Sequence, residues 1–274
     1  MTALPDPVLL APRVLHNMLQ LEDRARARRT DYCTNKQPAL VPHMRKIVTD
    51  WMLEVCQDHK SQSQVFFLAV NYLDHFLSCV TISPSQFQLV AATCLLLASK
   101  FCCEVFPLSS DLLAVYTDDS VTAAELRLWE LRVLGVLQWE LSSVTAHSFL
   151  EQLSNRVVLP GGLAVTSRNL FSQADTIAAL AATEYRFVLA RQSVLAAAAL
   201  AAAVREELGA EETVLVMKDL AAVINCSINE IFTALEQLSD FIELVLTCNT
   251  ENPAAFKKNK VNTACAEHQN FIVN

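Results

Sequence analysis

The chain has 274 residues, of which 53% are hydrophobic and only four are glycine, and its formal net charge is −8. These few glycines form no glycine-rich phosphate loop, dinucleotide-binding turn or nucleophile elbow, which excludes the enzymes that depend on those motifs. The acidic charge disfavours a nucleic-acid partner, because binding to phosphates needs a basic surface. The longest apolar run, residues 194–204, is too short to cross a bilayer, so no membrane partner is predicted.

The N-terminal region combines one predicted helix with a linker. Apolar residues recur at helical spacing over residues 8–22 and lead into a charged stretch that ends at Arg29. Residues 30–40 lack this spacing and are predicted to be a linker.

Five helices are predicted next, in quick succession. Residues 84–101 are apolar almost all round, which is typical of a central, buried helix. Thr122 and Glu125 have the spacing of a capping box at the start of the fifth helix. The predicted helices cover residues 42–58, 64–77, 84–101, 108–116 and 122–137.

The second half repeats this order. Its helices are predicted from about 145, over 167–188, 191–207, 214–224 and 227–247, and residues 191–207 are again apolar all round. The helix starts at 122 and 227 are 105 residues apart, which indicates two tandem five-helix units. The predicted fold is therefore all-α: an N-terminal helix and linker (1–37), two units (38–141 and 142–248) and a flexible C-terminal tail (249–274).

Residues for catalysis or metal binding are not found in the expected patterns. None of the nine cysteines forms a C-x-x-C pair, and no histidine begins an H-E-x-x-H motif. The odd number of cysteines, most of them in apolar stretches, is typical of a reducing intracellular compartment. We therefore predict no cofactor, no metal and no enzyme, but a protein that binds partners through helix surfaces.

Three features leave alternatives open. Lys100 ends the most apolar helix, where it either complements the helix dipole or meets a partner. Glu130 lies among apolar residues and belongs either to a solvated face or to a binding surface. A third feature is a stripe that is either core or an apolar groove with an acidic rim, suited to a peptide with Arg and Leu, and its members are Met44, Ile47, Trp51 and Glu54.

Several segments resemble the cyclin box. Residues 44–56 (MRKIVTDWMLEVC) resemble its opening helix, and the other similar segments are 71–78 (NYLDHFLS), 91–94 (AATC), 97–100 (LASK) and 116–119 (YTDD). The resemblance is to the D-type cyclins in particular, through 51–56 (WMLEVC), 129–134 (WELRVL) and 137–139 (LQW). It covers about residues 8–248 and is weaker in the second unit, where 178–183 (AALAAT) matches best.

The resemblance implies a role for each matching residue. All five signature positions of the family are filled, by Arg45, Asp74, Leu89, Lys100 and Glu130. Arg45 and Asp74 are expected to form an ion pair that fixes the first two helices of the unit against each other. Lys100 and Glu130, with Phe101 and Leu89, are expected to bind the partner kinase. The stripe of Met44, Ile47, Trp51 and Glu54, with Gln88, corresponds to the family's docking groove for Arg-x-Leu motifs in substrates and inhibitors.

The function implied by the resemblance is regulatory. A D-type-like cyclin, of vertebrate or viral origin, binds and activates a cyclin-dependent kinase, here expected to be of the four and six class, at the G1/S transition. Retinoblastoma-type pocket proteins are the expected substrates, and the nucleus and cytoplasm are the expected locations. One alternative is a virus-acquired cyclin with broader kinase choice. A second is a kinase-independent helical adaptor, which Cys102 and Cys103 at the expected kinase surface leave open. A third is a DNA-binding double cyclin fold of the transcription-factor type, which the acidic net charge disfavours.

Overall fold

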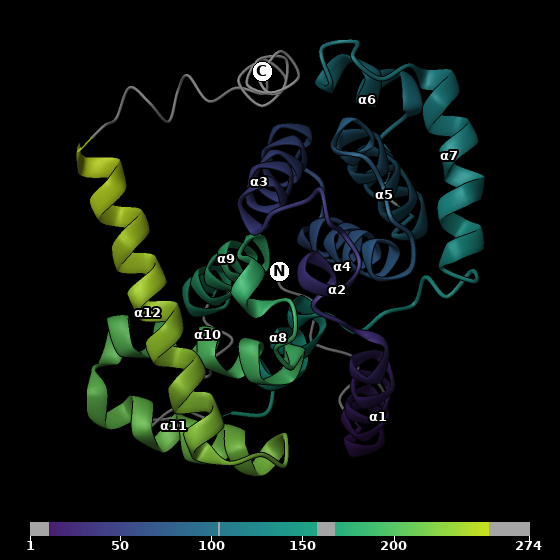
Figure 1. Ribbon diagram of the computed structural model, residues 1–274. Helices are drawn as coiled ribbons and strands as arrows, with labels where there is room; N and C mark the ends of the chain where they lie inside the picture. The colour runs from purple at the N-terminus through teal and green to yellow at the C-terminus, as the bar shows by residue number, and fades with distance from the viewer. Residues whose placement is uncertain (1–10, 104, 158–167, 252–274) are drawn as a thin grey trace.

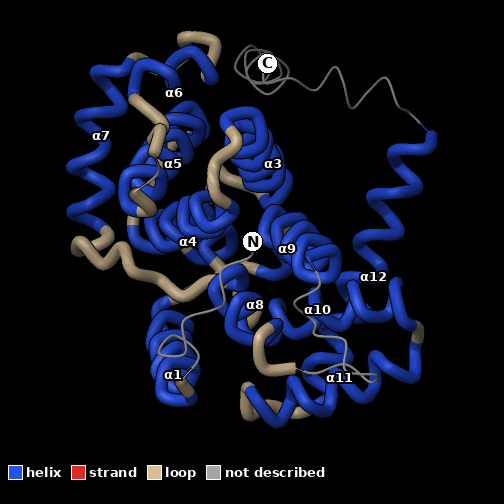
Figure 2. The backbone as a smooth tube through the Cα atoms, turned by 180° about the vertical axis from the view of Figure 1, so that it is seen from behind, coloured by secondary structure: helices blue, strands red, loops and turns tan. Residues whose placement is uncertain are grey.

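The computed structural model describes residues 11–103, 105–157 and 168–251. Within these ranges the regular secondary structure consists of α-helices and two 3-10 helices joined by loops, with no strand, so the predicted all-α fold is confirmed (Figures 1 and 2). None of the helices described is long and apolar enough to cross a membrane.

The first five-helix unit is built around α5. Residues 89–99 are buried on every side of that helix, because the sequence there is apolar all round, and α5 packs against the four other helices of the unit. We call this set the first unit: α3 (Pro42–His59), α4 (Ser63–Cys79), α5 (Phe87–Phe101), which the 3-10 turn η1 (Pro84–Gln86) precedes, α6 (Ser110–Tyr116) and α7 (Ala123–Val136).

The second unit has the same arrangement around α10. Residues 193–204 of that helix are buried, and the small alanine side chains allow neighbouring helices to approach closely. The second unit consists of α8 (Ala146–Ser154), α9 (Arg168–Thr183), the 3-10 turn η2 (Tyr185–Phe187), α10 (Gln192–Leu208), α11 (Ala210–Val223) and α12 (Ile228–Glu251). The two units are in contact through α9, which lies against α3 and α4 (Figure 1).

The N-terminal region differs from its prediction. Helix α1 (Pro12–Arg28) begins with a proline in its first turn and continues through the charged stretch that was expected to follow it. The predicted linker over residues 30–40 contains a short helix, α2 (Tyr32–Asn35), and the side chain of Asp31 accepts a hydrogen bond from the backbone N–H of Thr34 at its start. Residues 8–10 lie outside the described ranges.

Other boundaries also differ. The helix predicted over 167–188 ends at Thr183 and is followed by η2. Helix α11 begins at Ala210 rather than at 214, because Gly209, with φ of 101°, ends one helix and is followed at once by the next. Helix α12 continues to Glu251, past the predicted start of the tail at 249, and residues 252–274 lie outside the described ranges. The capping box of Thr122 and Glu125 is confirmed.

Candidate functional site

Lys100 and Glu130 form one ion pair at the surface of the first unit. Lys100 lies at the C-terminal end of α5 and Glu130 lies in α7. The packing of these two helices brings Nζ of Lys100 to 2.6 Å from Oε1 of Glu130. The Lys100 side chain is 50% exposed and that of Glu130 19%. An exposed pair of this kind stabilises a fold by only about 0–1 kcal/mol, so stability alone does not account for it.

Exposed apolar side chains accompany this pair. Phe101, directly after Lys100, is 41% exposed, and Val105 and Phe106 in the following loop are more exposed still. Leu128 and Leu131 of α7 are exposed as well, but positions one and two residues away on a helix do not face Glu130. The exposed Phe101 directly after Lys100 therefore supplies the apolar area next to this charge, as docking surfaces do.

Leu89 is not part of that surface. It lies in the first turns of α5, at the opposite end from Lys100, and belongs to the hydrophobic core with 8% of its side chain exposed. Leu89 therefore supports α5 from within and does not lie beside the Lys100–Glu130 pair.

The stripe on α3 is divided between core and surface. Trp51 is buried, and its indole N–H donates to the backbone carbonyl of Tyr116 at 3.3 Å. Met44 and Ile47 are half-buried, whereas Glu54 is exposed. Gln88 is half-buried on α5 and accepts a hydrogen bond from the Ser120 hydroxyl at 3.3 Å. Each of the two interpretations left open by the sequence thus describes some members of the stripe.

Arg45 and Asp74 form a bidentate ion pair. The Arg45 Nε atom lies 2.9 Å from Oδ1 of Asp74 and Nη2 lies 2.8 Å from Oδ2, while the Tyr32 hydroxyl donates to the same Oδ1. Arg45 is 2% exposed. Burial by itself lowers the pKa of Arg45, but the contacts with Asp74 and Tyr32 together outweigh it, so the pKa is raised and the guanidinium stays charged.

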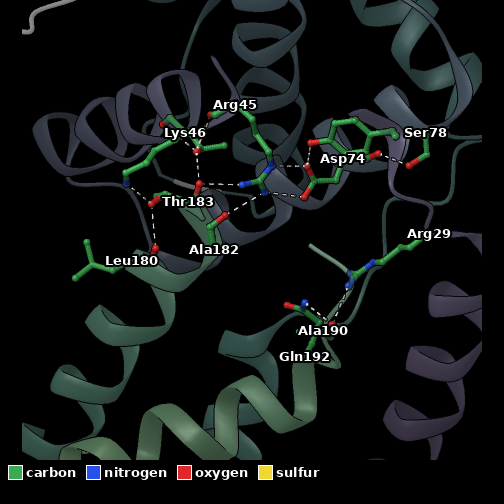
Figure 3. Close-up of polar contacts among 12 residues, drawn as sticks. Arg29, Arg45, Lys46, Asp74, Ser78, Leu180, Ala182, Thr183, Ala190 and Gln192 are labelled. Atoms are coloured by element: carbon green, nitrogen blue, oxygen red, sulfur yellow. Dashed lines mark hydrogen bonds and ion pairs between the residues drawn. The ribbon is translucent and has the colours of Figure 1, made fainter. Parts of the chain in front are cut away.

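Arg45 also joins the two units. Its guanidinium donates to the backbone carbonyls of Ala182, at 3.0 Å, and Thr183, at 2.9 Å (Figure 3). These carbonyls end α9, where the last turn of a helix leaves its acceptors without intrahelical partners and favours positive charge. The pair was expected only to fix α3 against α4, whereas it binds α9 of the second unit as well.

Lys46 adds a second set of contacts between the units. Its Nζ atom lies 3.1 Å from Glu184, 3.2 Å from Asp50 and 3.3 Å from the Thr183 hydroxyl. It also lies 5.5 Å from the ring centroid of Phe241 on α12. Burial raises the pKa of Asp50, and the nearby ammonium of Lys46 opposes that rise.

The N-terminal helix is bound to the second unit. Glu22 of α1 is buried and accepts hydrogen bonds from the backbone N–H of Ser193 at 2.7 Å and from its hydroxyl at 2.6 Å. The Arg191 Nε atom lies 3.4 Å from the same carboxylate. Ser193 is in the first turn of α10, so Glu22 caps that helix from a position 171 residues away. Sequence reasoning missed this contact, since no local pattern links the two residues.

A small cavity lies where Arg29, directly after α1, the Arg45–Asp74 pair and the second unit meet. Its volume is about 30 Å³, enough for a water molecule, and Arg29, Arg45, Asp74 and Gln192 contribute polar atoms to its lining. In the part of the chain that the structure describes, no group of histidine, cysteine or carboxylate side chains could hold a metal ion.

Comparison with known proteins places this geometry in a family. The chain matches the cyclin N-terminal domain over residues 13–142 and the cyclin C-terminal domain over residues 144–271. It is 44% identical over 202 residues to the G1/S-specific cyclin-D3 of Homo sapiens, which covers 73% of this chain and 68% of that protein. It is 39% identical over 243 residues to the G1/S-specific cyclin-D1 of Xenopus laevis, covering 87% and 82% respectively.

A solved structure has the same fold. The X-ray structure of a viral cyclin from herpesvirus saimiri matches with a TM-score of 0.69 and 26% sequence identity, over 83% of this chain and 97% of that chain. Cyclins are regulatory subunits of protein kinases and are not enzymes themselves. With both cyclin domains matched along most of its length, the chain belongs to the cyclin family.

Proposed function

We propose that this chain is a D-type-like cyclin that binds and activates a cyclin-dependent kinase of the four and six class at the G1/S transition. The relatives named G1/S-specific cyclin-D3 and cyclin-D1 support the cell-cycle role. The observation that carries the choice of surface is the Lys100–Glu130 pair, in which the Lys100 side chain is half exposed and is followed at once by the exposed Phe101.

Activation follows from preferential binding to the active form of the kinase. The first unit binds the mobile αC helix, which places the αC glutamate on the catalytic lysine and orders the activation loop. The gain in rate comes from a shift of the kinase population toward the active form, so the cyclin must bind the active form more tightly than the inactive one. Such an interface commonly buries about 2,000 Å² or more in total.

The test is to remove the pair without disturbing the fold. Because docking removes water from charges next to apolar surface, we expect Lys100→Ala or Glu130→Ala to weaken kinase binding by about 2–5 kcal/mol. The measurement is co-purification with the kinase, together with a thermal melt of each variant. Arg205→Ala is the matched control, because Arg205 forms an exposed ion pair with Glu236 between α10 and α12 of the second unit, away from this surface. Kinase binding at the control's level by both pair variants would contradict the proposal.

Substrate docking on α3 is proposed separately. Met44 and Glu54 reach the surface, so they are the residues to change, whereas Trp51 is part of the core. We expect Met44→Ala with Glu54→Lys to slow phosphorylation of Arg-x-Leu-bearing substrates, including a pocket protein, and to spare a short peptide that lacks the motif. Equal slowing of both substrates would assign the stripe a purely structural role.

This role places the chain in the nucleus and the cytoplasm, where such a kinase and its substrates meet. Imaging of a fluorescently tagged full-length chain in dividing cells tests this, and exclusion from the nucleus throughout the cycle would contradict it.

A further inference from the structure

A groove of about 250 Å³ opens on the second unit, away from the Lys100–Glu130 surface of the first. Helices α9 and α12 both pack against α10, and the groove lies between them near the C-terminal end of α10. Its lining is one face of α9 together with single residues from the other two helices: Ser172, Gln173, Thr176, Ile177, Leu180, Glu206 and Ile242. The volume is below the roughly 300–1,000 Å³ of most small-molecule sites, so it suits one or two side chains of a peptide.

The lining combines an apolar floor with hydrogen-bond acceptors. Ile177, Leu180 and Ile242 supply the apolar surface. Glu206 supplies a carboxylate at the exposed end of α10, and no basic side chain is found among the described residues of the lining. This charge selects a partner group that is positive and carries N–H donors.

Gln173 provides a second, independent observation. Its side-chain oxygen is buried and has no hydrogen-bond partner in the structure. An unpaired buried polar atom costs roughly 1–3 kcal/mol, so native proteins rarely retain one without a use. The Gln173 side chain is half-buried and lines the groove, so a rotation of its amide would turn this oxygen into the groove, where a ligand that donates a hydrogen bond would satisfy it.

The C-terminal ends of the two central helices, α5 and α10, can be compared because the two units repeat the same order of helices. At the end of α10, Arg205 binds Glu236 of α12 at 3.4 Å, as Lys100 at the end of α5 binds Glu130 of α7. The next residue is the exposed Phe101 in the first unit and Glu206 in the second. The same place in the two units therefore carries apolar surface in one and negative charge in the other.

We propose that this groove of the second unit binds a peptide segment of a partner protein that carries a lysine or arginine next to an aliphatic side chain. The basic group pairs with Glu206, a donor meets the Gln173 oxygen, and the aliphatic side chain packs on Ile177, Leu180 and Ile242. The site is independent of kinase binding, so its failure would leave the proposed function intact.

The test begins with selection of peptides from a random display library on the full-length chain. Peptides that also bind the Thr176→Arg variant are discarded, because the arginine fills the groove with bulk and positive charge. Thr233→Arg is the matched control. Both threonines are exposed on helices, and each hydroxyl donates at 2.8 Å to the carbonyl four residues earlier. We expect the surviving peptides to be enriched in a basic residue beside Leu, Ile or Val.

Binding of one selected peptide is then measured by fluorescence polarisation. Glu206→Lys is expected to weaken it about tenfold, and Glu207→Lys, at the exposed neighbouring position, by less than about twofold. Gln173→Leu is expected to weaken binding severalfold without lowering the melting temperature, since it removes an unpaired buried oxygen. A thermal melt of each variant confirms that it is folded.

Three outcomes would overturn the proposal. The first is that no selected peptide distinguishes Thr176→Arg from Thr233→Arg. The second is enrichment of acidic or uncharged sequences. The third is selection of sequences like residues 252–263 of this chain, which include Phe256 and Lys257, together with competition by a synthetic copy of that segment, since the occupant would then be the chain itself.

Discussion

The two units share an order of helices but differ in how the central helix begins. In the first unit the turn before α5 is closed locally, where the backbone N–H of Ser83 donates to the side chain of Gln86 three residues later. In the second unit the first turn of α10 depends on Glu22, which comes from α1. The second unit is therefore completed by a segment that lies before the first unit in the chain.

The joint between the units reinforces this difference. Arg45, in the first helix of the first unit, donates to the end of α9, and Tyr185 of the second unit donates its hydroxyl to Asp31 in the N-terminal segment. Contacts from both the first unit and the N-terminal segment thus converge on the second unit. Two sequence repeats with the same helices need not be equivalent folding units, because their unpaired helix ends are satisfied by different parts of the chain.

Of the changes considered, loss of Arg45 is expected to lower the free energy of unfolding the most, because Arg45 joins the two units. Arg45→Ala breaks the buried ion pair with Asp74, which keeps only the Tyr32 hydroxyl as a donor, and this typically costs about 3–5 kcal/mol. It also removes the Arg45 hydrogen bonds to the two carbonyls that end α9. Arg45→Lys is expected to be intermediate, because an ammonium cannot make the bidentate pair and both carbonyl contacts at once. Urea unfolding measures the free energy of each variant, and Arg24→Ala at an exposed position of α1 is the control. Equal stability of Arg45→Ala and the control would show that the joint does not hold the units together.

The second prediction is that loss of the Glu22 charge destabilises the second unit and not the first. Glu22→Gln keeps the shape of the side chain but removes the charge that accepts both Ser193 hydrogen bonds, and we expect a loss of about 1–3 kcal/mol. Hydrogen exchange should become faster in the first turn of α10 and remain unchanged in that of α5. Asp23→Asn, at the exposed neighbouring position, serves as the control. Equal acceleration in both central helices would mean that Glu22 stabilises the whole protein rather than the second unit.

The smallest expected effect is the dependence of stability on pH through His147. His147 of α8 stacks on Phe67 of the first unit, and its Nδ1 atom lies 2.7 Å from Asp175 of α9, while Glu151 lies 3.6 Å from Nε2. Burial lowers the pKa of His147, but the hydrogen bond to Asp175 and the negative charges of Asp175 and Glu151 together outweigh it, so the pKa is raised above 6.5. The stabilisation is complete below pH 6.5, the unfolded value, and is lost as the pH rises through the folded pKa.

Melting temperatures across this range test the prediction. The wild-type chain should lose stability as the pH rises above about 6.5, and Asp175→Asn should flatten that slope. His43→Gln is the control, because His43 is exposed at the start of α3. An unchanged slope in Asp175→Asn would show that this pair does not link pH to the contact between the units.

Gly135 shows one limit of prediction from the sequence. It lies inside α7, where a glycine costs about 1 kcal/mol relative to alanine, and the sequence offers no reason for it. In the structure it is exposed, and an added Cβ would meet no atom within 4 Å. The fold therefore does not require glycine at this position.

The candidate site was predictable to different degrees. Lys100 and Glu130 each stand out as a charge in an apolar segment, and the resemblance to cyclins assigns both to one surface. Their direct contact could not be predicted, because it depends on how α5 packs against α7. The division of the α3 stripe was equally hidden, since helical spacing puts Trp51 and Glu54 on one face without saying how far neighbouring helices cover it.

The sequence by itself determined the all-α class, the tandem repeat of five helices and the two central helices, because helical periodicity and caps are local properties of the chain. Only the tertiary structure decided which parts of the chain satisfy the buried charges and helix ends. Glu22 reaches Ser193 and Arg45 reaches Thr183 over 171 and 138 residues, and no spacing in the sequence encodes such contacts. They form because buried polar groups must find partners, and packing decides which ones are near enough.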